Sequence, residues 1–200
     1  MSIRRVLTVM GSEWPATPDA VRKLDELFEN FGRRVLAYAA RRTPTLADAE
    51  DAAAETFAIA WRKIEQMPDD ALPWLLAVAR RVLANQRRGD HRRESLVARL
   101  GQRVSSHHAP SIAGESADGP ALSALARLRT DDQELLRLVA WDELDHAAIA
   151  IVLGITPNAV AIRLHRARKR FEEELKDSRR TRTDTEAKGA INGAVQERTE

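Results

Sequence analysis

Hydrophobic residues recur along most of this chain at the three- and four-residue spacing of amphipathic helices. The pattern is clearest in residues 21–42, 45–64, 73–88 and 157–171, and no long alternation of apolar and polar residues indicates a strand. It breaks between residues 101 and 120, where serine, glycine and proline accumulate and apolar residues are scarce. The pattern therefore predicts an all-α protein with two small helical domains joined by a flexible linker.

The same patterning divides the chain into five segments. We assign residues 1–20 to an N-terminal extension, 21–100 to a first helical domain, 101–120 to the linker, 121–176 to a second helical domain, and 177–200 to a polar tail that we expect to be disordered. In the first domain we expect a loop over 65–73, a helix that starts at Pro73, a helix end at Gly89 and a further basic helix over 91–100. In the second domain we expect a turn over 130–132 and a last helix that ends near Leu175.

The stretch GITPNAVAIRLHRARKRF, residues 154–171, has the start signals of the second helix of a helix-turn-helix. Gly154 can adopt the left-handed conformation that ends a helix, Thr156 is a good N-cap, and Pro157 is tolerated at the first helical position. The apolar face of this helix carries Val160, Leu164, Ala167 and Phe171. A polar, basic opposite face favours entry into the major groove of DNA, and the alternative is a helical hairpin with a solvated arginine face.

The segment over residues 45–64 predicts a helix with an acidic outer face. Thr45 is its expected N-cap, with Asp48 three residues further on in a variant of the capping box. The apolar stripe comprises Ala54, Phe57, Trp61 and Ile64, and the opposite face carries Asp48, Asp51, Glu55 and Arg62. Taken alone, this face is best interpreted as solvated, because acidic residues near a helix N-terminus are favourable in water.

The helix expected from Pro73 carries a dense basic face. Its inward residues are Leu75, Val78, Ala79, Val82 and Leu83, and its outward residues include Arg80, Arg81, Arg87 and Arg88. A basic face of this density usually meets phosphate. Trp74, at the head of the helix, is either a core residue, which is the default, or a platform on which an unpaired base stacks.

Composition and charge narrow the class of function. The net charge is only +2, and the pI is about 9.3. The charges are segregated along the chain, since acidic residues gather early and basic residues gather near 80–93 and 163–170, and this indicates two kinds of partner. The chain has no cysteine, which excludes disulfides and thiolate metal sites, and His107–His108 is a weak metal candidate, so we expect neither metal nor cofactor.

No recognisable catalytic motif is present in the sequence, so we expect no enzyme. Neither a signal peptide nor a run of about 18 apolar residues is present, so we expect a cytoplasmic protein without membrane insertion.

Three stretches in this order resemble the extracytoplasmic-function (ECF) group of the sigma-70 family of RNA polymerase sigma factors. DAEDAAAETFAIAWRKI, residues 48–64, resembles the family's acidic-aromatic helix, and PWLLAVARRVLANQRRGDHRR, residues 73–93, resembles its promoter-melting helix. ELDHAAIAIVLGITPNAVAIRLHRARKRFEEEL, residues 143–175, resembles its C-terminal helix-turn-helix. The resemblance implies a sigma region 2-like bundle, followed by a linker and a sigma region 4-like helix-turn-helix domain.

The resemblance also assigns roles to the surfaces. It implies that the acidic face, with Asp48, Asp51, Glu55 and Arg62, docks on the β′ clamp helices of core RNA polymerase. The loop over 65–73 and the helix after it become the reader of the −10 element, which captures a flipped base, with Trp74, Arg80, Arg81, Asn85, Arg87 and Arg88 as candidates. The reader of the −35 element comprises Thr156, Asn158, Ala161, Ile162, Arg163, His165, Arg166, Arg168 and Lys169. Promoter DNA, the polymerase β flap and an anti-sigma factor are further implied partners.

The sequence departs from the family pattern at several site positions. Arg81 stands where asparagine is common, and Asn85 stands where aspartate is common. Ala161 and Ile162 leave fewer polar groups for base edges than the family usually presents. A stand-alone helix-turn-helix regulator is the alternative function, although it leaves the acidic helix and the first basic helix without a role.

Overall fold

The computed structural model describes the backbone of residues 17–99 and 119–196, and the side chains of residues 17–90, 92 and 119–178. The described residues form helices and contain no strand, which confirms the predicted all-α class. Residues 101–118 of the predicted linker, with His107–His108, lie outside the described residues, as does nearly all of the N-terminal extension. Pro120, the last residue of the predicted linker, is the first residue of α5. The helices divide into two compact units, one with α2, α3, η1, α4 and α7, and one with α5, α6 and α8.

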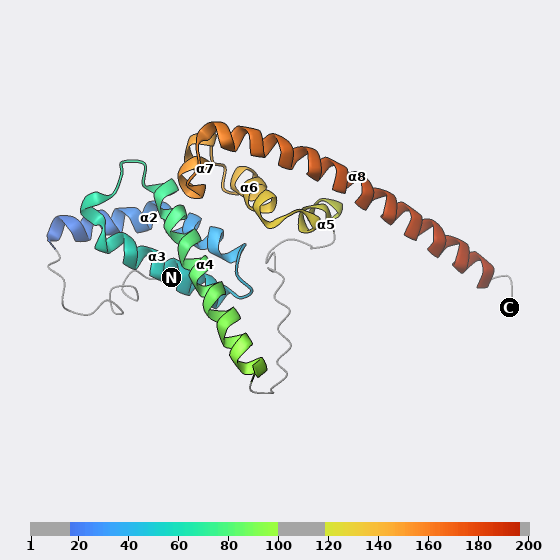
Figure 1. Cartoon of the computed structure of the whole chain (residues 1–200), viewed down its shortest axis with the longest axis horizontal. Helices are drawn as coiled ribbons and strands as arrows, with labels where there is room; N and C mark the ends of the chain where they lie inside the picture. Colours follow the sequence, from blue (N-terminus) through green and yellow to red (C-terminus); the bar gives the residue numbers. More distant parts are fainter. Residues whose placement is uncertain (1–16, 100–118, 197–200) are drawn as a thin grey trace. The chain divides into compact units, whose positions relative to one another are not determined.

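Helices α2 (Pro18–Ala40), α3 (Leu46–Arg62) and α4 (Ala71–Arg99), with the short 3-10 helix η1 (Ile64–Gln66), pack together in the first unit (Figure 1). Each helix contributes one apolar face, as the predicted stripes require. The core includes Leu24, Val35 and Tyr38 from α2, Ala49, Ala52, Ala53, Phe57 and Trp61 from α3, and Leu75, Val78, Ala79, Val82 and Leu83 from α4. The rings of Phe28 and Phe57 meet edge to face with centroids 5.1 Å apart, which joins α2 to α3.

A buried arginine closes the C-terminal end of α2. The Arg42 guanidinium lies 3.5 Å from the centroid of the fully buried Tyr38 ring and donates a hydrogen bond of 2.9 Å to the Tyr38 carbonyl oxygen. The charge is thereby stabilised by a cation–π contact and by one of the carbonyl groups that a helix end leaves without a partner. Arg87 of α4 donates to the Arg42 carbonyl oxygen at 3.5 Å, so this corner also anchors α4.

Helices α5 (Pro120–Arg127) and α6 (Thr130–Ala140) pack against α8 (Pro157–Gln196) in the second unit. Figure 1 shows α8 continuing far beyond its contacts with these two helices. The side chains that are buried here include Ala124, Leu125, Leu135, Leu138, Val160, Leu164 and Ala167. Arg170 of α8 donates to the Asp132 carboxylate at 2.7 Å, and the Asp132 side chain is only 12% exposed. This ion pair fixes the rotation of α8 against α6 at the edge of the apolar contact.

Helix α7 (His146–Leu153) precedes α8 in the chain, and all of its residues except His146 group with the first compact unit. Ile149, Ala150 and Val152 of α7 are buried, while Ile151 is exposed.

No single helix among the described residues is long and apolar enough to cross a membrane. Only α7 and the first part of α8 together have the length and composition of a span, and they form a pair bent by 97°. The predicted domain boundaries themselves stay predictions.

Two predicted boundaries in the first unit are wrong. Helix α4 begins at Ala71 rather than at Pro73, because a proline is tolerated within the first turn, where the N–H groups have no helical acceptor. Helix α4 also continues through Gly89, so the expected second basic helix is part of α4. A glycine inside a helix costs only about 1 kcal/mol, which does not end a helix whose neighbouring residues favour it.

Three further boundaries, in α6, α8 and α2, also differ from the prediction. Residues 130–132 are the first turn of α6, not a loop, because Asp131 and Asp132 interact favourably with the positive end of the helix dipole. Helix α8 runs to Gln196, well beyond the predicted end near Leu175 and into the tail expected to be disordered, and no proline follows Pro157 to stop it. Helix α2 starts at Pro18 with Thr17 as its N-cap, three residues before the predicted start.

We predict that Gly89→Ala and Gly154→Ala change stability in opposite directions. A Cβ atom added at either position meets nothing within 4 Å, so backbone conformation alone decides the sign. Alanine should stabilise α4 at position 89 by about 1 kcal/mol, because it is the better helix former. It should destabilise the turn at position 154 by about 1–2 kcal/mol, because the φ angle there is +68°. Urea denaturation followed by circular dichroism measures both changes in the free energy of unfolding, and changes of the same sign would contradict the prediction.

Candidate DNA-binding and polymerase-binding surfaces

A short turn between α7 and α8 positions the first candidate surface. Gly154 has a φ of +68°, and the Ile155 N–H donates to the Ala150 carbonyl oxygen at 3.1 Å, which is the hydrogen bond of a Schellman C-cap. Thr156 then caps α8, since its hydroxyl oxygen accepts from the Ala159 N–H at 3.2 Å. The order of helix, glycine turn and second helix along the chain is that of a helix-turn-helix. The predicted roles of Gly154, Thr156 and Pro157 at this turn are confirmed.

The two faces of α8 separate as the sequence predicts. Val160, Leu164 and Ala167 are fully or almost fully buried, and Phe171 is half-buried. The −35 candidates lie on the other side: Thr156, Asn158, Ile162, Arg163, His165, Arg166, Arg168 and Lys169 are exposed, and Ala161 is half-buried. No ion pair within the described residues engages Arg163, Arg166, Arg168 or Lys169. About two turns of helix therefore present several free cations to solvent, and such a surface attracts phosphate.

The next arginine on α8, Arg170, has a different environment. Its ion pair with the mostly buried Asp132 makes it a structural contact between α8 and α6. The Arg127 Nη1 atom of α5 lies 3.8 Å from Oε2 of Glu174, and this longer ion pair adds a weaker link between α5 and α8. Spacing alone groups Arg170 with the other cations of this helix, and only the fold separates it from them.

Helix α4 presents the second basic surface. Arg80, Arg81, Asn85, Arg87 and Arg88 are exposed, opposite the buried Leu75, Val78 and Val82. Two of the five are coupled, because Arg88 donates a hydrogen bond to the Asn85 side-chain oxygen. Arg87 is partly committed to the Arg42 carbonyl oxygen, whereas Arg80 and Arg81 extend into solvent. The structure therefore brings all five to one side of one helix, with unequal freedom to bind a ligand.

A short loop leads into this basic helix. Residues 67–70 connect η1 to α4, so the loop is shorter than the predicted 65–73. The Met67 side chain is buried and anchors the loop, whereas Pro68, Asp69 and Asp70 are exposed. Trp74 is half-buried in the first turn of α4, which is intermediate between a core residue and an exposed stacking platform. The loop and Trp74 therefore lie at the N-terminal end of α4, the helix whose outer side carries the arginines.

Helix α3 presents an acidic surface of its own. Asp51 and Glu55 are exposed and four residues apart, so they lie on the same side of the helix, and Arg62 is exposed near its end. Asp48 is half-buried and belongs to the cap, since its N–H donates to the Thr45 hydroxyl oxygen at 3.1 Å and its carboxylate accepts from that hydroxyl at 2.7 Å. Of the three predicted acidic residues, Asp51 and Glu55 are therefore the exposed carboxylates that are free for a partner.

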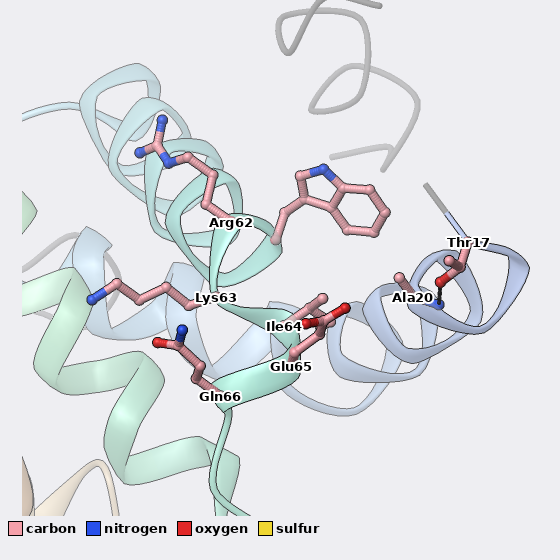
Figure 2. Close-up of a pocket in the computed structure, with 8 residues that line it drawn as sticks. Thr17, Ala20, Arg62, Lys63, Ile64, Glu65 and Gln66 are labelled. Atoms are coloured by element: carbon pink, nitrogen blue, oxygen red, sulfur yellow. Dashed lines mark hydrogen bonds between the residues drawn. The ribbon is translucent and has the colours of Figure 1, made fainter. Parts of the chain in front are cut away.

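A shallow hollow of about 160 Å³ lies beside this surface, at the end of α3. Figure 2 shows Ile64 and Glu65 of η1 facing Ala20 of α2 and its N-cap Thr17, while Arg62 extends away from them. Its volume is below the range of about 300–1,000 Å³ that is usual for small-molecule sites. No group of acidic or histidine side chains within the described residues is arranged to hold a metal ion. The hollow therefore gives no support to an enzymatic interpretation.

Sequence reasoning missed several structurally important residues. Tyr38 is fully buried beneath Arg42, and the charged side chains of Asp132, Arg137 and Asp142 are buried near α6. No periodicity rule separates such residues from solvated ones, because burial depends on which helices meet. Glu143 has a φ of +53° in the segment before α7, a conformation that only the fold reveals.

Comparison with known proteins matches both halves of the chain. Residues 27–93 match the family described as Sigma-70 region 2, and residues 119–171 match Sigma-70, region 4. The probable RNA polymerase sigma factor RfaY of Xanthomonas campestris is 32% identical over 170 residues, which cover 80% of this chain and 41% of that protein. The ECF RNA polymerase sigma factor SigL of Mycobacterium tuberculosis is 29% identical over 145 residues, covering 70% of this chain and 82% of that protein. The chain thus spans about two fifths of the first relative and most of the second.

Two solved structures share the fold. The sigma factor RpoE in complex with the anti-sigma factor NepR, from Bartonella quintana, aligns with a TM-score of 0.58 and 22% identity over 76% of this chain and 96% of that chain. CnrH in complex with the cytosolic domain of CnrY aligns with a TM-score of 0.55 and 20% identity over 79% of this chain and 95% of that chain. The first family match covers most of α2, all of α3 and most of α4, and the second runs from the start of α5 into α8. With both regions matched in the family's order, the chain belongs to the sigma-70 family of RNA polymerase sigma factors, in its extracytoplasmic-function group.

Proposed function

We propose that this protein is an initiation factor that binds core RNA polymerase, recognises the −35 and −10 elements of its promoters, and helps to open the DNA. The observation that carries the proposal is the separation of charge on the folded chain. Asp51 and Glu55 are exposed on α3, whereas exposed arginines gather on α4 and on α8. Two surfaces of opposite sign suit two kinds of partner, a basic protein surface and DNA. The protein performs no chemistry itself and acts with polymerase in the cytoplasm.

Recognition of the −35 element falls to the exposed face of α8. Cations such as Arg163, Arg166 and Lys169 neutralise phosphates and release counterions, which supplies affinity and orientation. Asn158, near the helix start, carries an amide that can pair with the edge of an adenine. The capped N-terminus of α8 is the end that a helix-turn-helix directs toward the bases.

Opening of the −10 element falls to the loop over 67–70 and to α4. A flipped base costs a few kcal/mol in lost stacking and pairing, so contacts to the base and the backbone must compensate. Arg80 and Arg81 are free to hold the displaced strand, and the half-buried Trp74 offers a ring face at the start of the helix. The hydrogen bond that Arg88 donates to the Asn85 side-chain oxygen fixes the orientation of the Asn85 amide on this helix.

Docking to polymerase falls to the acidic face of α3. Asp51 and Glu55 complement the basic clamp helices of the β′ subunit, and complementary charge increases the rate of encounter and fixes the register. The second unit then contacts the β flap while α8 binds DNA. RpoE and CnrH, which share the fold, were each solved in complex with another protein, in RpoE an anti-sigma factor, so we extend the proposal to an anti-sigma partner here.

In vitro transcription tests the proposal directly. Core RNA polymerase freed of sigma factors is mixed with the purified protein and a genomic promoter library, and the 5′ ends of the transcripts are sequenced. We expect new starts that share spaced −35 and −10 elements. No new starts, together with tight sequence-specific DNA binding by the protein alone, would support a stand-alone helix-turn-helix regulator instead.

We predict that Arg166→Ala weakens recognition of the −35 element and leaves core binding intact. Arg166 is exposed on the DNA-facing side of α8, and loss of one arginine contact to a base typically costs about 1–3 kcal/mol. Affinity of the holoenzyme for promoter fragments, measured by fluorescence anisotropy, checks the effect. Lys176→Ala is the matched control, because Lys176 is exposed on the same helix but outside the predicted surface. Equal losses in DNA binding and core binding would contradict the assignment.

We predict that the double change Asp51→Arg and Glu55→Arg weakens core binding by more than about tenfold, because like charges then face the clamp helices. Both side chains are exposed, so the fold should survive, and circular dichroism can verify this. Core affinity is measured by competition with a labelled sigma factor.

The matched control is Glu26→Arg with Glu29→Arg, which makes the same change in net charge at exposed positions of α2. Core affinity close to that of the unmodified protein is expected for this control. If the two double variants weaken binding equally, net charge rather than the α3 surface determines affinity.

A further inference from the structure

An apolar side chain lies within the basic face of α8. Ile162 is 46% exposed, whereas the other exposed residues around it are polar or charged. At about 100° per residue, Ile162 is about 160° away from both Val160 and Leu164 around the helix axis. Since Val160 and Leu164 are buried, Ile162 lies near the middle of the outward face rather than at its margin.

The neighbours of Ile162 place it among the groups that meet DNA. Asn158 is four residues before it, and His165 and Arg166 are three and four residues after it, so all three are adjacent to it on the helix surface. The half-buried Ala161 adds only a methyl group and leaves room beside the isoleucine. Thr156 caps the helix about two turns before Ile162, so the residue lies in the N-terminal part that a recognition helix directs into the groove.

The floor of the major groove offers an isoleucine one good contact. Guanine, adenine and cytosine present hydrogen-bonding groups there, while thymine adds a C5 methyl group to its O4 acceptor. Isoleucine has no side-chain donor or acceptor. If it packs against an amino or carbonyl group of a base, that group loses its hydrogen bond to water and gains none from the protein. Packing against the thymine methyl instead buries two apolar surfaces together.

We infer that Ile162 is a specificity-determining residue that recognises the C5 methyl group of one thymine in the −35 element. The inference rests on the proposed function and deepens it, because it assigns one base preference to one side chain. Arg163, Arg166, Arg168 and Lys169 then supply affinity through phosphates and base edges, and Ile162 discriminates thymine from cytosine at a single position. Leu46, Trp141 and Ile151 are also exposed, but none of them lies on the outward face of α8.

The test removes only the methyl group from the DNA. The holoenzyme, formed from the full chain and core polymerase, first selects its −35 element from a randomised duplex library. Each thymine of the selected element is then replaced singly by deoxyuridine, and the dissociation constant of each duplex is measured. One replacement should weaken binding about fourfold, which corresponds to the about 0.8 kcal/mol expected for one buried methyl group.

The same replacements are measured with Ile162→Ala. This variant should bind the thymine and deoxyuridine duplexes equally at that one position, while its response at the other thymines is unchanged. Ile151→Ala is the matched control, because Ile151 is the same residue type, is 51% exposed and lies on α7 rather than α8. It should keep the fourfold difference. A duplex with 5-methylcytosine at the position should bind Ile162-containing protein more tightly than the cytosine duplex.

The outcomes separate this inference from the proposed function. If the holoenzyme selects a −35 element but no thymine responds to deoxyuridine, or if Ile162→Ala keeps the response, the inference is wrong and the function stands. If Ile162→Ala weakens core binding instead, the residue belongs to a protein interface and the inference is also wrong. If the holoenzyme selects no element and initiates no transcripts, the proposed function fails.

Discussion

The burial of one face of α8 is the constraint on which the exposed basic surface of this helix, proposed to bind DNA, depends. Val160, Leu164 and Ala167 are buried in the unit that α8 forms with α5 and α6, and the Arg170–Asp132 ion pair lies at the edge of that contact. Because a helix is rigid, burial of these residues determines which residues point outward. The apolar contact on the buried face therefore determines the direction in which the exposed residues of α8 point, although Arg166, Ile162 and their neighbours are not part of that contact.

Burial of one apolar face per helix also determines which residues are exposed in the first unit, where α3 exposes acidic residues and α4 exposes arginines. Helix α3 buries a row of alanines together with Phe57 and Trp61, which permits close packing against α2 and α4 and leaves Asp51 and Glu55 outside. Helix α4 buries its aliphatic residues and leaves its arginines outside. Acidic and basic surfaces thus lie on different helices of one bundle, which is the charge separation on which the proposed binding of polymerase and DNA rests.

Much of the helical architecture could be predicted from local chemistry. The caps Thr45 and Thr156, the left-handed Gly154 and the buried stripes of α3, α4 and α8 all follow from side chains that act within one or two turns. Prediction failed where weak local preferences competed. Gly89, Pro73 and residues 130–132 each resembled a boundary, but the cost of continuing a helix through such residues is small compared with the gain from packing and from additional helical hydrogen bonds.

The sequence by itself determined the class of the protein, the start of each main helix to within a few residues, and the membership of the acidic and basic faces. It could do so because helical periodicity and capping are short-range effects. Only the tertiary structure decided that Arg170 and Arg42 serve the fold and that Arg166 remains free in solvent. Those distinctions depend on partners from other helices or on the exact placement of a side chain, which one-dimensional spacing does not contain.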